Sequence, residues 1–167
     1  MNFLFYLLVS TSVTIDNVVI GQTTSIAFRK VALISTFIHV TLLSFGSYIA
    51  PHFASSFPEF AHWMTSILFL CLACLSLWTT INHKHKEMIS SIKGVMLLSA
   101  FLALDALILG LTPLVSDHLE TVLIGVLLLS PIFVLIGRIT LEGGSKITKG
   151  FGYIETMLFI GLAIHSL

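Results

Sequence analysis

Six continuous apolar runs occupy most of this chain of 167 residues, and each is about as long as a helix that crosses a lipid bilayer. Only 10% of the residues are charged, whereas a soluble domain carries roughly 25%. The runs are continuously apolar rather than alternating, which argues against a membrane β-barrel. We therefore expect an all-α integral membrane protein with six transmembrane helices. Their expected ranges are 2–20, 31–50, 60–81, 94–115, 119–137 and 151–167.

The basic residues indicate how these helices are oriented in the membrane. All eight Lys and Arg residues fall in the first, third and fifth loops between the expected helices. With six spans these loops lie on one face, and the positive-inside rule makes that face cytoplasmic. The first run lacks the basic leader and cleavage site of a removed signal peptide. The sequence predicts a multi-pass protein of the bacterial inner membrane, with both termini outside and with the lipid bilayer, not nucleic acid, as its partner.

One short polar pattern occurs twice, each time inside an apolar run. A serine is followed by an aspartate six residues later, then by a glycine and a threonine, and the aspartates are Asp16 and Asp105. Three runs precede the loop 82–93 and three follow it, so the second half is inverted relative to the first. We expect two inverted three-helix repeats, residues 1–81 and 94–167, joined by a cytoplasmic loop.

Asp16 and Asp105 are the strongest candidates for a functional site, because a carboxylate inside a bilayer is costly and usually has a function. Carboxylates at equivalent positions of two repeats are typical of transporters that bind at the repeat interface. Their use as protonated, hydrogen-bonded links between helices is the alternative. Asn17, His39 and Glu155 also lie inside apolar runs, as further metal ligands or as interhelix hydrogen-bonding groups.

Gly21 and Gly110 each follow one of the aspartates by five residues. A glycine at this position suits local unwinding, which offers backbone carbonyls to a cation, or close packing of two helices. Both interpretations make these glycines structural or gating residues.

Cys71 and Cys74 form a C-x-x-C pair on one face of an expected helix. Two thiols suit a soft metal or a redox pair, although two small apolar residues in a membrane helix are the simpler interpretation. A membrane dithiol relay is therefore an alternative function, but such relays place their cysteines on two spans.

The segments 14–21 (TIDNVVIG) and 104–110 (LDALILG) resemble the paired aspartate motifs of MntP-type manganese exporters, in the LysE-like transporter superfamily. Further matches are Gly-Arg at 137–138 and Lys-Gly-Phe-Gly at 149–152. The size, the six spans, the inverted halves and the outside termini fit the same family. The resemblance covers essentially the whole chain and implies a transporter rather than an enzyme, with no resident cofactor.

The resemblance also implies roles for individual residues. Asp16, Asn17 and Asp105 would belong to the cation site, and Arg138 would be a conformational or gating residue. The sequence departs from the family pattern at His39, which replaces an acidic residue.

We expect the function to be export of a divalent cation, Mn²⁺, which prefers carboxylate, carbonyl and water ligands and tolerates imidazole. His39 or Glu155 would complete the ligand set, and exchange for protons would offset the charge that is moved. Another cation or a small solute of the same superfamily is the alternative cargo. The sequence leaves open whether several copies form a homo-oligomer.

Overall fold

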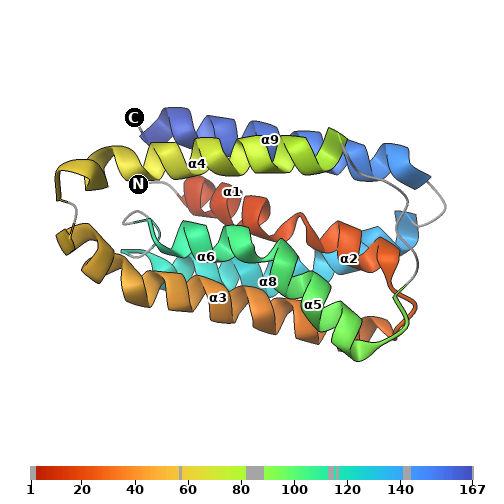
Figure 1. Cartoon of the computed structure of the whole chain (residues 1–167). Helices are drawn as coiled ribbons and strands as arrows, with labels where there is room; N and C mark the ends of the chain where they lie inside the picture. Colours follow the sequence, from red (N-terminus) through yellow and green to blue (C-terminus); the bar gives the residue numbers. More distant parts are fainter. Residues whose placement is uncertain are drawn as a thin grey trace.

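Long helices run side by side along one axis of the molecule, as the apolar sequence predicts (Figure 1). Among the described residues, three helices are long and apolar enough to cross a membrane: Phe28–His52, Ile92–Gly110 and Leu119–Ile139. The prediction of an all-α membrane protein is therefore confirmed. The computed structural model describes residues 3–56, 58–81, 89–112, 115, 117–140 and 144–166.

The chain passes back and forth along the bundle. Its described helices are α1 (Phe3–Thr14), α2 (Asn17–Thr23), α3 (Phe28–Ser56), α4 (Pro58–Ile81), α5 (Ile92–Leu102), α6 (Leu104–Gly110), α8 (Leu119–Ile139) and α9 (Gly144–Ser166). α4 and α9 lie side by side on one flank, and α1 and α2 lie between this pair and the other helices (Figure 1). The start of α1 and the end of α9 lie at the same end of the bundle (Figure 1).

Two of the expected spans are interrupted next to their aspartates. The first is interrupted at Ile15 and Asp16, between α1 and α2, and the fourth at Ala103, between α5 and α6. Backbone hydrogen bonds still lead into each interruption, from Ile15 N to Thr11 O at 3.0 Å and from Ala103 N to Ser99 O at 2.9 Å. Each expected span therefore consists of two shorter helices with the aspartate at or just after the junction.

Glycines allow two pairs of helices to cross in close contact. A Cβ atom added to Gly21 of α2 would stand 3.1 Å from the Cα atom of Gly137 on α8. A Cβ atom added to Gly46 of α3 would likewise stand 3.1 Å from the Cα atom of Gly110 on α6. The helical segments around Gly21 and Gly110 are thus packed closely, and the interruptions of the helices lie ahead of them, near the aspartates.

Two clusters of buried apolar side chains hold the helices together. The larger joins α1, α3, α4, α6, α8 and α9, and the smaller joins α2, α3, α5 and α8. Along the first span, Asp16 lies between Val13 of the larger cluster and Ile20 of the smaller one. Along the fourth, Asp105 lies between Ala103 and Ala106, which both belong to the larger cluster. Asp16 therefore lies between the two apolar clusters along the chain, and Asp105 lies within the larger one.

Candidate metal centre

Three acidic side chains from distant parts of the chain converge at the helix interruptions. Asp16 directly precedes α2, Asp105 lies in the first turn of α6, and Glu155 lies on α9. Each offers one carboxylate oxygen, and these three atoms all lie within 4.8 Å of one another. Asp105 and Glu155 are buried, whereas Asp16 is partly exposed. The fold thus brings together three of the residues that the sequence marks as candidate ligands.

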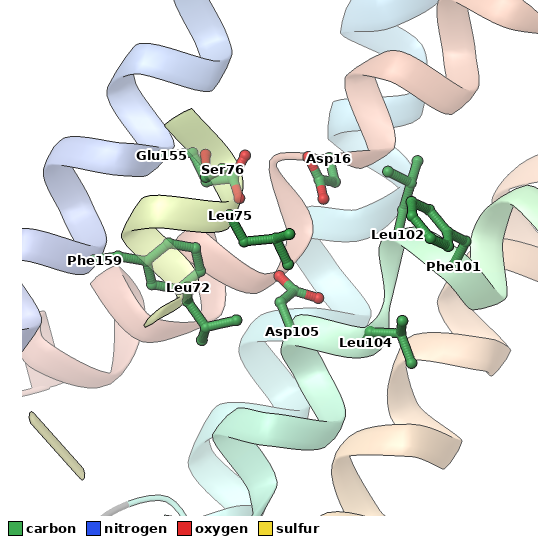
Figure 2. Close-up of a pocket in the computed structure, with 10 residues that line it drawn as sticks. All are labelled: Asp16, Leu72, Leu75, Ser76, Phe101, Leu102, Leu104, Asp105, Glu155 and Phe159. Carbon is green, nitrogen blue, oxygen red and sulfur yellow. The ribbon is translucent and has the colours of Figure 1, made fainter. Parts of the chain in front are cut away.

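The three acids line a cavity of about 150 Å³ (Figure 2). Liquid water occupies about 30 Å³ per molecule, so a cavity of this size has room for a cation with a few water molecules. Figure 2 shows the carboxyl groups around a common space, with the apolar side chains of Leu72, Leu75 and Phe159 beside them. The other lining residues are Ser76, Phe101, Leu102 and Leu104. This largely apolar wall strengthens the attraction between the carboxylates and a bound cation.

A backbone hydrogen bond orients one of the acids. The Oδ1 atom of Asp105 accepts a hydrogen bond from the backbone N of Ala106 at 2.6 Å. The Oδ2 atom of Asp105 is buried and has no hydrogen-bond partner among the described residues. The side chain of Ser76 lies beside the Glu155 carboxyl group at the cavity (Figure 2). An unpaired buried carboxylate oxygen is unfavourable, so the Oδ2 atom of Asp105 is suited to meet a ligand.

Among the residues that line the cavity, Ser76 is the polar side chain that the sequence does not single out. Its hydroxyl donates to the carbonyl O of Gly152 at 3.3 Å and accepts from the hydroxyl of Thr156 at 3.1 Å. Ser76 thereby joins α4 to α9 next to Glu155. A single serine in an apolar run carries no motif or periodicity, so only the packing of α4 on α9 reveals its place.

Asn17 and His39 lie in a second polar cluster rather than among the carboxylates. The Oδ1 atom of Asn17 accepts a hydrogen bond from the hydroxyl of Ser35, and its Nδ2 donates to the Oγ atom of Ser130 at 3.0 Å. The Nδ1 atom of His39 lies 2.9 Å from the carbonyl O of Ser35. Both polar side chains are fully buried, so this cluster joins α2, α3 and α8 in the interior. The amide of Asn17 is therefore already hydrogen-bonded within the protein.

Arg138 lies in the last turn of α8, directly after the glycine that contacts Gly21. Its Nε and Nη2 atoms are buried and have no hydrogen-bond partner among the described residues. Arg138 does not line the cavity of the three acids. Its position at a close helix crossing suits a residue whose contacts change with conformation, which remains a prediction.

Three acids around an interior cavity of a helical membrane bundle are typical of a multi-pass membrane protein that transports a cation. A family model described as "Putative manganese efflux pump" matches residues 25–165. The chain belongs to this MntP family, as the motifs indicate, and the family is one of transporters. The matched residues include Asp105 and Glu155 and begin after Asp16. Searches of curated proteins and of solved structures find no match to the chain.

The alternative of a membrane dithiol relay is not supported. The family is described by metal efflux and not by redox chemistry. Cys71 and Cys74 are free thiols on the exposed side of α4, and neither lines the cavity. The cysteine pair therefore has the surroundings of two small side chains on an outer helix face.

Proposed function

We propose that this protein exports Mn²⁺ across the bacterial inner membrane and that Asp16, Asp105 and Glu155 form its cation site. The observation that carries the proposal is the approach of their three carboxylate oxygens to within 4.8 Å of one another. Mn²⁺ favours carboxylate and water ligands, which the three acids and the cavity beside them can supply.

The separation of the oxygens suits a single ion. Hard divalent cations bind oxygen atoms at about 2.0–2.6 Å, so two ligands of one ion stand at most about 4–5 Å apart. Oxygens within 4.8 Å of one another are therefore close enough to share one cation after small side-chain movements. Water in the cavity of about 150 Å³ would complete the coordination shell.

Charge movement favours exchange of the metal for protons. Moving a doubly charged ion outward against 100 mV costs about 4.6 kcal/mol, because each charge costs about 2.3 kcal/mol. Inward movement of two protons in each cycle cancels that charge. The same three carboxyl groups can hold protons when the metal has left, so the site would alternate between metal-bound and protonated forms.

Six spans arranged as two inverted repeats would give the two sides of the membrane equivalent access to this site. In support, α2 packs on α8 at Gly21 and Gly137, and α6 packs on α3 at Gly110 and Gly46. Exchanging the two halves of the chain converts one contact into the other. Six spans put both termini on the same side of the membrane, and the positive-inside rule would place that side outside the cytoplasm.

Transport into proteoliposomes tests the proposal. Purified protein is reconstituted into liposomes that contain a metal-sensitive dye. Mn²⁺ is added outside in two assays, one at equal pH and one with an outwardly directed proton gradient. We expect the dye to be quenched faster than in protein-free liposomes, and faster with the gradient than without it. Wild-type protein that moves no Mn²⁺ would contradict the proposal. A parallel series with Fe²⁺, Co²⁺, Zn²⁺ and Cd²⁺ decides between Mn²⁺ and another cargo.

A further inference from the structure

A second hollow lies between α3 and α8, on the outer face of the bundle. Its volume is about 530 Å³, within the usual range of roughly 300–1,000 Å³ for ligand sites. Apart from Arg29 and Thr36, its wall is made of apolar side chains. None of these residues lines the cavity of the three acids, so the hollow is a separate feature of the molecule.

The hollow is a groove about as long as one leaflet of a bilayer. It extends along α3 from Arg29 to Val40, which is about 16 Å at a rise of about 1.5 Å per residue. The hydrocarbon core of a bilayer is about 30 Å thick, so one leaflet contributes about 15 Å. The candidate span begins at Phe28, which places Arg29 at the membrane surface and Val40 near the middle of the membrane.

The groove has open, apolar sides. Leu33 and Phe37 of α3 are 73% and 69% exposed, and Leu127 of α8 is 52% exposed, so these lining side chains are open to the surroundings of the bundle. Pro131 of α8, which has no long side chain, also lines the groove. Such a groove is suited to an extended hydrocarbon chain rather than to a compact polar ligand.

We propose that this groove binds an anionic phospholipid, with the phosphate at Arg29 and one acyl chain along α3 and α8 as far as Val40. A guanidinium group binds a phosphate through paired, charge-assisted hydrogen bonds. The acyl chain covers the apolar wall, which a free phosphate ion would leave uncovered. A zwitterionic lipid binds less well because its ammonium group comes close to Arg29.

Quenching of tryptophan fluorescence by brominated lipids tests this site. The native tryptophans, Trp63 and Trp78, are exposed on α4 and are replaced by phenylalanine. Phe37→Trp then reports on the groove, and Met157→Trp reports on the exposed face of α9. In mixed micelles, brominated phosphatidylglycerol should half-quench the groove tryptophan at a severalfold lower mole fraction than brominated phosphatidylcholine. The two lipids should quench the α9 tryptophan alike.

The neighbouring cations provide a matched control. Arg29 and Lys30 are both exposed, but only Arg29 lines the groove. Arg29→Gln should abolish the preference for phosphatidylglycerol at the groove tryptophan, and Lys30→Gln should keep it. Equal quenching by the two lipids, or equal loss in both variants, would overturn the proposal. Native mass spectrometry of the unsubstituted protein should also detect retained phosphatidylglycerol, and its absence would count against the site.

Discussion

Asp16 and Glu155 come from opposite ends of the chain, and each places a carboxylate oxygen within 4.8 Å of the other. Asp105 adds a third oxygen within the same distance. Two unit charges so close repel each other by roughly 3 kcal/mol at an effective dielectric constant of about 20. Three such pairs would use up much of a typical folding free energy of about 5–15 kcal/mol. The folded protein therefore needs a cation or protons in this cluster.

Removing one charge at a time should impair transport without unfolding the protein. Asp16→Asn, Asp105→Asn and Glu155→Gln keep the shape of each side chain but lose its charge. Loss of a group that merely supports a metal ligand costs about 10–100-fold in affinity or activity, and loss of a ligand should cost at least as much. Mn²⁺ flux in proteoliposomes, normalised to the amount of reconstituted protein, measures the effect.

Glu120→Gln is the matched control for these variants. Glu120 is an exposed acid in the first turn of α8 and lies outside the cavity. This variant should transport Mn²⁺ at the rate of the wild type. If Asp16→Asn and Asp105→Asn also did so, these carboxylates would have only a structural role.

Metal binding should release protons. Because the three acids cannot all be ionised in the empty site, Mn²⁺ has to displace at least one proton when it binds. The apparent affinity should then fall as the pH is lowered from about 8 to 6, by about tenfold per pH unit for each proton displaced. Calorimetric titrations in buffers of different ionisation enthalpy count the protons. Glu155→Gln should reduce that count, and binding without proton release would exclude proton exchange at this site.

The close helix crossings should be sensitive to a single methyl group. In Gly46→Ala and Gly137→Ala the added Cβ atom would collide with the backbone carbonyls of Leu107 and Val18. Forcing an extra methyl group into a packed contact typically costs about 1–3 kcal/mol. Both variants should therefore have lower thermal unfolding temperatures in detergent.

Gly161→Ala is the control, because a Cβ atom at Gly161 meets nothing within 4 Å. Alanine favours a helix over glycine by about 1 kcal/mol, so this variant should be as stable as the wild type or more stable. Unchanged stability in all three variants would mean that the helix crossings at Gly46 and Gly137 have room for a methyl group.

The sequence alone marked the three acids that the fold brings together in the candidate site, because each stands out from its surroundings. Asp16 and Asp105 share equivalent positions in a repeated pattern, and Glu155 is a charge within an apolar run. A charged residue in an apolar run indicates a functional site, because placing a charge inside the membrane is costly. The family resemblance was confirmed by a match that covers residues 25–165.

The separation of the polar residues into two groups could not be predicted in the same way. Asn17 follows Asp16 directly, yet it forms hydrogen bonds with Ser35 and Ser130 on other helices. Neighbouring residues on a helix point in different directions, and which partner each meets depends on helix rotation. The position of Ser76 beside Glu155 at the cavity likewise follows from how α4 packs on α9, for which the sequence holds no local signal.

The cysteine pair should be dispensable for transport. Cys71 and Cys74 are exposed on α4 and do not line the cavity, so a variant with Cys71→Ser and Cys74→Ser should keep the Mn²⁺ flux of the wild type. Flux through the reconstituted variant, compared with wild type in the presence and absence of a reductant, measures this. Complete loss of transport with normal folding would instead support a function that depends on the thiols.

This cysteine-free variant also allows the predicted orientation in the membrane to be measured. The positive-inside rule places the loop 82–93 in the cytoplasm and the C-terminus outside. Single cysteines are introduced at Lys86 and after Leu167, and intact cells are treated with a maleimide that cannot cross the membrane. The C-terminal cysteine should be labelled in intact cells, and the cysteine at residue 86 only after the membrane is permeabilised.

Permeabilised cells provide the internal control, because both positions react equally there if the thiols are accessible. Labelling of both from the outside, or of neither, would place the two positions on the same side of the membrane. An even number of spans would then separate residue 86 from the C-terminus instead of the three proposed, and the inverted-repeat arrangement of Asp16 and Asp105 would have to be abandoned.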